Sequence, residues 1–183
     1  MAGGIAHGEN RRYQVSCRDV LTFRDPQLTP WAADGIDVPF DLPDTRWTFD
    51  VALKDTKGSL VLVECRRTTG AVKQEDVAAF AHKIETVRKA LAIPVAGIFI
   101  AKREHQIGAI KVAQCNGIQT AILEQNSIPP GFNITFLRYS AEREKQVRDF
   151  VMHICTGSLA ITGYPPTVVQ TKLEDGSLER NDA

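Results

Sequence analysis

The chain lacks several sequence patterns that would assign it to a common functional class. Its four cysteines are scattered, with no CxxC pair and no histidine at metal-ligand spacing, which favours reduced thiols over a zinc site or a disulfide scaffold. Neither GxGxxG nor GxxxxGK[ST] occurs, so no nucleotide cofactor is expected. No apolar run could span a bilayer and the N-terminal residues do not resemble a signal peptide, so we expect a cytoplasmic protein with no membrane partner.

The chain also lacks net charge, because 22 Lys and Arg residues balance 22 Asp and Glu residues. Proteins that bind nucleic acids commonly carry a basic surplus, so neutrality argues mildly against this class. The charges are unevenly distributed, however. Residues 44–115 hold more bases than acids, whereas residues 1–43 and 171–183 hold more acids. The middle of the chain can therefore present a positive surface, which permits DNA binding.

Length and composition indicate one folded domain. The chain has 183 residues, of which 43% are hydrophobic and 24% charged, as in an ordinary soluble globular protein. We expect a disordered N-terminus over residues 1–11, a domain over 12–155 and a C-terminal extension or tail over 156–183. Residues 12–23 fit either a strand or a short helix. Five prolines and glycines predict that residues 25–45 form a looping connection.

The middle of the domain alternates between strand and helix patterns. Alternating apolar runs flank a short polar segment, Asp55–Ser59, which predicts a β-hairpin. The subsequent helices are each followed by an apolar strand, which predicts parallel crossover units and a mixed sheet covered by helices. The expected strands are 46–53, 59–66, 95–101, 118–123 and 134–137. A first helix is expected between Gly70 and Pro94, with apolar positions from Val77 to Leu91, and two further helices at about 105–116 and 141–154.

Three charged residues stand at the end of the predicted hairpin. Glu64 and Arg66 are two residues apart in a strand, so their side chains share one face. Asp50 lies on the partner strand. Charged side chains are costly to bury unless they have polar partners or a functional role. Asp50, Glu64 and the backbone carbonyl of Cys65 could bind Mg²⁺, which prefers oxygen ligands and often takes only one or two carboxylates. Alternatively, Asp50 and Glu64 form a surface ion pair with Arg66 or Arg67, which would contribute at most about 1 kcal/mol.

The segment from Asp50 to Leu123 resembles the Mrr-like branch of the PD-(D/E)xK nuclease superfamily. In that family an acid on one strand precedes a strand that ends in an E/Q-C-K motif, followed by a helix, an apolar strand, a second helix and a further strand. The matching segments here are Val63–Arg67, Val72–Val77, Gly97–Ile100 and Asn116–Ile118.

The resemblance implies an α/β fold with a restriction-endonuclease-like core, in which a central mixed β-sheet is flanked by helices. It implies a metal-dependent endonuclease that hydrolyses DNA phosphodiester bonds with Mg²⁺ or Mn²⁺, in restriction or phage defence. DNA is the implied partner, and a homodimer or larger assembly is expected. Asp50 and Glu64 would bind the metal, and Arg66 stands where the family has its catalytic lysine.

Arg66 is a departure from the family pattern. Arginine keeps the positive charge of lysine but cannot release a proton at any accessible pH. Lys73, at the start of the following helix, is the nearby lysine most expected to reach the site, and Lys54 is a weaker candidate. Glu9 is the acid best placed to match the one on the family's N-terminal helix. The alternative function is a catalytically silent nuclease fold that serves as a DNA-binding or assembly module.

Overall fold

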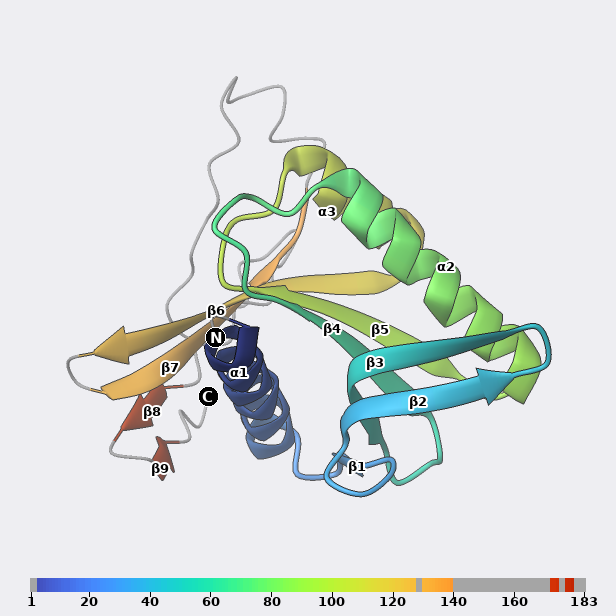
Figure 1. The fold of residues 1–183 in the computed structure, drawn as a ribbon, viewed down its shortest axis with the longest axis horizontal. Coiled ribbons are helices and arrows are strands. Elements are labelled where there is room, and N and C mark those ends of the chain that lie inside the picture. Colours follow the sequence, from blue (N-terminus) through green and yellow to red (C-terminus); the bar gives the residue numbers. More distant parts are fainter. Residues whose placement is uncertain (1–2, 128–129, 140–171, 175–176, 180–183) are drawn as a thin grey trace, which may run out of the picture.

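A mixed β-sheet runs through the molecule and carries helices on both of its faces (Figure 1). The computed structural model describes residues 3–127, 130–139, 172–174 and 177–179. The helices are α1 (Gly3–Arg24), α2 (Gln74–Leu91) and α3 (Ile107–Cys115). The strands are β1 (Thr29–Pro30), β2 (Ile36–Leu42), β3 (Thr45–Lys54), β4 (Leu60–Arg66), β5 (Val95–Ala101), β6 (Ile118–Ser127), β7 (Pro130–Leu137), β8 (Lys172–Glu174) and β9 (Ser177–Glu179).

The strand order confirms the mixed sheet predicted from the sequence. The order is β1-β3-β4-β5-β6-β7, with β2 also paired to β3. β3 and β4 form the expected antiparallel hairpin, and β6 and β7 are antiparallel as well. α2 connects β4 to the parallel strand β5, and α3 connects β5 to the parallel strand β6. The fold is therefore α/β, with a central mixed sheet flanked by helices.

Helix α2 forms where its apolar spacing and its end residues predict it. Val77, Phe80, Ile84 and Val87 are all buried, so one stripe of the helix faces the sheet. At its start, the side chain of Asp76 accepts a hydrogen bond from the Lys73 backbone N–H at 3.2 Å. It ends at Leu91 and is followed by Ala92, a C-cap residue in the left-handed conformation, two residues before Pro94.

The core is divided by the sheet into two layers. One layer lies beneath α2 and α3 and includes Leu60 and Leu62 of β4, and the other lies beneath α1 and includes Val61 and Val63. The side chains of β4 thus alternate between the two layers, as the sequence predicts. Continued along the strand, this alternation directs Glu64 and Arg66 toward the α2 side and Cys65 toward the α1 side.

The expected disorder of residues 1–11 is wrong for the residues described there, because α1 begins at Gly3. Residues 12–23, which fitted a strand or a helix, belong to the same helix. Cys17, Val20 and Leu21 are buried at helical spacing, and tertiary packing against the sheet therefore supports the helix. The glycines near the N-terminus have low helix propensity and conceal the helix in the sequence.

The expected looping connection over residues 25–45 is also wrong, because it contains β1 and β2. Ile36, Val38 and Phe40 of β2 are buried and alternate with exposed residues. Pro39 interrupts this pattern in the sequence, but among the described strands β2 has a neighbour on one side only, and proline is tolerated in such an edge strand.

The C-terminal predictions are largely beyond the described residues. The helix expected at about 141–154 lies outside them, and so does the boundary placed at residue 155. Within the expected extension 156–183, β8 and β9 form a short antiparallel pair. The strand expected at 134–137 is present and begins earlier, at Pro130.

We predict that Gly97 is required for the close approach of α2 to the sheet. A Cβ at this position would collide with Cδ1 of Ile84 and lie 3.1 Å from Cγ1 of Ile118. Gly97→Ala should therefore lower the free energy of unfolding by about 1–3 kcal/mol, the usual cost of overpacking. Chemical denaturation measures this change.

The matched control removes the colliding atom. In an Ile84→Val background, which lacks Cδ1, Gly97→Ala should cost clearly less than in the wild-type protein. An equal cost in both backgrounds would show that contact with Ile84 does not set the helix position.

Candidate active site

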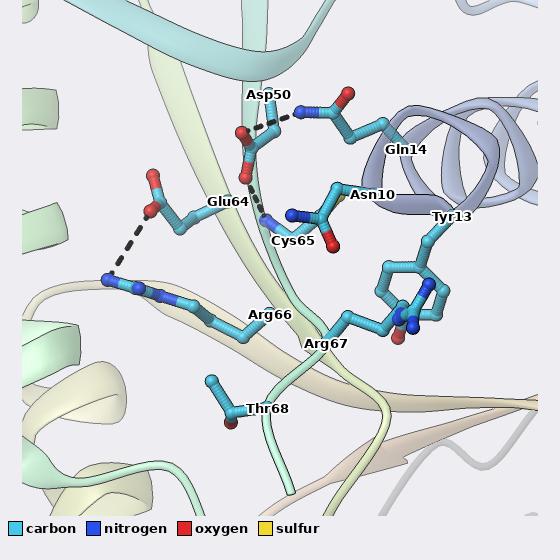
Figure 2. A pocket seen from close by; sticks show the side chains of 9 residues that line it. All are labelled: Asn10, Tyr13, Gln14, Asp50, Glu64, Cys65, Arg66, Arg67 and Thr68. Atoms are coloured by element: carbon cyan, nitrogen blue, oxygen red, sulfur yellow. Dashed lines mark hydrogen bonds and ion pairs between the residues drawn. The ribbon is translucent and has the colours of Figure 1, made fainter. Parts of the chain in front are cut away.

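A cavity of about 310 Å³ opens at the end of β4, between α1 and the loop that follows the strand (Figure 2). It brings together residues that are far apart in the sequence, from α1, β3 and β4. Its lining residues are Asn10, Tyr13, Gln14, Asp50, Glu64, Cys65, Arg66, Arg67 and Thr68. Asp50, Glu64, Cys65 and Arg66, four of the residues expected from the sequence to form a site, are therefore neighbours around one cavity.

Asp50 lies where the pairing of β3 with β4 ends and the pairing of β3 with β2 continues. The β3–β4 register ends at Val51–Val63, whereas β2 pairs with β3 from Val51 back to Thr45. Phe49 packs in the α2 layer and Val51 in the α1 layer, although residues two apart in a regular strand share a face. The strand is consequently irregular at Asp50, and its carboxylate turns toward β4.

Two hydrogen bonds fix the Asp50 carboxylate. Oδ2 accepts the backbone N–H of Cys65 at 2.6 Å, and Oδ1 accepts Nε2 of Gln14 at 2.9 Å (Figure 2). The Gln14 amide also donates to Oδ1 of Asp37 at 2.8 Å. Both amide protons of Gln14 are thus directed to carboxylates, and α1 orients the acid of β3.

Glu64 is largely enclosed, with its side chain 13% exposed. Burial raises the pKa of Glu64, and the nearby charge of Asp50 raises it further. Lys83 opposes this shift, with Nζ 3.3 Å from Glu64 Oε2, and Arg66 opposes it less strongly, with Nη2 3.7 Å from Oε1. Two carboxylates that repel each other in a partly buried cavity favour the binding of an additional cation.

Arg66 lies between two acids. Its Nη2 is 3.7 Å from Glu64 and 3.6 Å from Oδ1 of Asp76 at the start of α2. Its Nε is buried and has no hydrogen-bond partner among the described residues. Arg66 therefore reaches the α2 side of the strand together with Glu64, as the alternation of β4 predicts.

The Cys65 side chain points away from these charges, into the α1 layer. Burial raises the pKa of the Cys65 thiol, and the neighbouring thiol of Cys17 raises it further, so a thiolate ligand is disfavoured. The backbone of Arg66 bonds toward β5, through Lys102 N–H at 2.9 Å. Since backbone groups alternate along a strand, those of Cys65 face β3, which places its carbonyl on the side of Asp50.

Lys73 is not among the residues that line the cavity. It is exposed and immediately precedes α2, where its backbone N–H bonds Asp76. Lys83 is instead the α2 lysine that contacts Glu64, and the sequence interpretation missed it. Its position, three residues after Phe80 and four before Val87, marks it as adjacent to the buried stripe of the helix.

An ion pair connects the N-terminal helix to the rim of the cavity. Glu9 of α1 pairs with Arg67, and the pKa of Glu9 is lowered, chiefly by its hydrogen bond to Arg67 and by that cation's charge. The acid that was expected to match the family's N-terminal helix thus lies at the cavity but contacts a cation. Both side chains are partly exposed, so the pair stabilises the fold only weakly.

The donor set around Asp50 suits a hard divalent cation. Two carboxylates and the Cys65 carbonyl supply oxygen only, which is the chemistry that Mg²⁺ and Mn²⁺ prefer. Within the side chains that the structure describes, no group of three or more His, Cys, Asp or Glu residues could hold a metal ion. A metal here would thus have two carboxylate ligands, and water or substrate oxygens would complete its coordination.

Comparisons with known proteins give no family for the chain. No protein-family model matches it, and no curated protein does. Among solved structures, a repair endonuclease from Pyrococcus abyssi is 20% identical with a TM-score of 0.44, over 57% of this chain and 44% of that one. EndoMS bound to double-stranded DNA is 20% identical with a TM-score of 0.40, over 57% of this chain and 41% of that one. EndoMS in its apo form is 24% identical with a TM-score of 0.38, over 57% of this chain and 42% of that one.

The chain thus spans less than half the length of these structures. In the part of the chain that the structure describes, no helix is both long and apolar enough to cross a membrane.

We predict that Gln14 holds Asp50 in place. Gln14→Leu removes the amide that bridges Asp37 and Asp50 and leaves a carboxylate oxygen of each without this donor. The free energy of unfolding should fall by about 1–3 kcal/mol, as expected when partly buried polar atoms lose a partner. Urea denaturation measures the change, with Gln119→Leu at an exposed site in β6 as the control. Equal losses in both variants would contradict the bridging role.

Proposed function

We propose that the protein is a metal-dependent endodeoxyribonuclease that hydrolyses DNA phosphodiester bonds with Mg²⁺ or Mn²⁺. The observation that carries this proposal is the pair of carboxylates at the cavity. Asp50 is held by two hydrogen bonds, and Glu64 is partly buried with a raised pKa, next to cations from β4 and α2. Asp50 is held by a backbone N–H and by the amide of the buried Gln14, contacts that an exposed ion pair does not explain.

The chemistry follows from the roles of these groups. Asp50, Glu64 and the Cys65 carbonyl would hold the metal. When bound, it would lower the pKa of a water molecule and offset the charge of the phosphate. In the net reaction, the oxygen of one water molecule would become bonded to phosphorus, the bond from phosphorus to the leaving oxygen would break, and the proton lost by the water would be matched by the proton that the leaving oxygen takes up. Arg66 would neutralise the negative charge that develops on the phosphate, a task that requires no proton transfer by the guanidinium.

A second hollow of about 390 Å³ borders the same loop as the first and has two cations that could contact a polymeric, anionic substrate. Thr68 lines the first cavity, and its neighbour Thr69 lines the second, so one loop borders both. Lys102 and Arg103 stand at this second hollow and are exposed, and two acids, Glu104 and Glu124, line it as well. A nucleic-acid strand with one phosphate near Asp50 and Glu64 could therefore place flanking phosphates near these cations.

A catalytically silent DNA-binding or assembly module is the second candidate function. Arg66 favours it, because arginine replaces the family's lysine and is shared between Glu64 and Asp76. The role of Lys73 also stays a prediction, since its side chain must turn back from the start of α2 to reach the cavity. A role in restriction or phage defence, and a homodimer or larger assembly with one such cavity for each DNA strand, remain parts of the proposal.

The cleavage prediction tests the enzyme directly. The wild-type protein should nick supercoiled plasmid with Mg²⁺ or Mn²⁺ and not with EDTA, as gel electrophoresis would show. Asp50→Asn and Glu64→Gln should each reduce the rate by about 10²-fold or more, because each removes a charge at the reacting centre. Asp41→Asn and Glu85→Gln, at exposed positions outside the cavity, are the matched controls.

Two outcomes would contradict this prediction. DNA binding without nicking under either metal would favour the silent module. Nicking that persists in both Asp50→Asn and Glu64→Gln would place the active site elsewhere.

The DNA-binding prediction tests the second hollow without cleavage. In EDTA, the affinity of the protein for a short duplex should fall with salt, and Lys102→Ala with Arg103→Ala should make this dependence less steep by about 2 in the log–log slope, roughly 1 per lost phosphate contact. Fluorescence anisotropy measures it. The control is Lys54→Ala with Lys57→Ala, at the opposite end of β4. A slope that changes equally in both double variants would exclude a specific role for the hollow.

A further inference from the structure

Lys83 is the only lysine, among the described residues, that pairs with Glu64. Its Nζ lies 3.3 Å from Glu64 Oε2, and the two side chains are 23% and 13% exposed. The pair thus joins α2 to the end of β4 across a partly buried interface. At this distance and burial, the charge of Lys83 interacts with Glu64 more strongly than exposed ion pairs do.

Two aromatic side chains lie close to the Lys83 ammonium group. Its Nζ is 5.9 Å from the ring centroid of Trp47 and 5.9 Å from that of Phe49, both on β3. Phe49 is fully buried and directly precedes Asp50. The rings limit the hydration of the ammonium group and favour its position over the carboxylate. The strand that supplies Asp50 therefore also supplies the two rings that lie next to the Lys83 ammonium group.

Arg66 is a weaker partner of Glu64 than Lys83. Its Nη2 lies farther from the carboxylate, at 3.7 Å, and lies as close to Asp76, at 3.6 Å. Arg66 is also the more exposed cation, at 40%. The Lys83 ammonium has Glu64 as its acid partner, whereas Arg66 is divided between two acids.

We propose that Lys83 has two roles at the candidate site. The first is to neutralise the Glu64 carboxylate before metal binds, and the second is to provide a positive charge that is needed near the phosphate during cleavage. The second role rests on the proposed nuclease function, whereas the first does not. Because Lys83 occupies one oxygen of an expected metal ligand, it competes with a divalent cation for Glu64. Removal of Lys83 should therefore strengthen metal binding and weaken cleavage, two effects of opposite direction.

The metal-binding experiment uses the full-length protein and MnCl₂ in a calorimetric titration without DNA. Lys83→Met should bind Mn²⁺ about tenfold more tightly than wild type, the change that corresponds to about 1.4 kcal/mol. Lys83→Arg, which keeps the charge, should stay near the wild-type affinity. The control Lys89→Met changes an exposed lysine of the same helix that pairs with Glu85 and should have no effect. Unchanged or weaker Mn²⁺ binding in folded Lys83→Met overturns the proposal.

The cleavage experiment compares the same variants on plasmid DNA. Lys83→Met should cut about 10²–10³-fold more slowly, as when one charge-stabilising group is lost, and Lys83→Arg should recover part of the rate. A merely structural lysine would not give tighter metal binding together with slower cleavage. If cleavage is lost in Lys73→Met and retained in Lys83→Met, the proposal is overturned.

Two controls accompany the calorimetric and cleavage experiments. Thermal melting verifies that each variant is folded, and Lys83→Gln replaces Lys83→Met if the latter does not fold. If the wild-type protein cuts no DNA, the nuclease proposal fails, and the calorimetric comparison still decides whether Lys83 neutralises Glu64.

Discussion

The hydrogen bond from the Cys65 backbone N–H to the Asp50 carboxylate is the interaction on which the candidate site depends. It forms where β3 ceases to pair with β4, so a side chain replaces the strand carbonyl that would otherwise accept this N–H. Buried backbone donors are costly to leave unpaired, and the bond thus satisfies the β4 backbone at the place where the two strands separate. The same separation opens the cavity next to Glu64, so strand geometry and the acidic pair have one common origin.

The parts of the fold that the sequence predicts are those governed by short-range periodicity. The α2 stripe, the β3–β4 hairpin and the apolar strand β5 each show their period within a few residues, and all three are present. α1 and β2 are different, because their stability comes from packing that the local sequence does not display. Glycines conceal the start of α1, and Pro39 interrupts β2, yet both elements bury apolar side chains against the sheet.

The candidate site likewise contains some residues that the sequence predicts and others that it does not. Glu64 and Arg66 share a face because of strand alternation, and Asp50 lies near them because of the hairpin, so these positions follow from the sequence. Gln14 and Lys83 were not predicted to belong to the site. Each approaches from a helix on a different face of the sheet, and their positions depend on how α1 and α2 pack, a long-range property. Lys83 borders the buried stripe of α2, and this was the signal available for it.

Electrostatics explains why both helices are needed at one cavity. Burial and the Asp50 charge both raise the pKa of Glu64, so the ionised acid pair is unfavourable without compensation. Gln14 from α1 donates a hydrogen bond to Asp50, and Lys83 from α2 pairs with Glu64. Each helix therefore provides a partner for one of the two acids. The two carboxylates therefore remain adjacent because different layers of the fold stabilise them. The arrangement keeps two like charges side by side, and a divalent cation with oxygen ligands from both acids would relieve the repulsion between them.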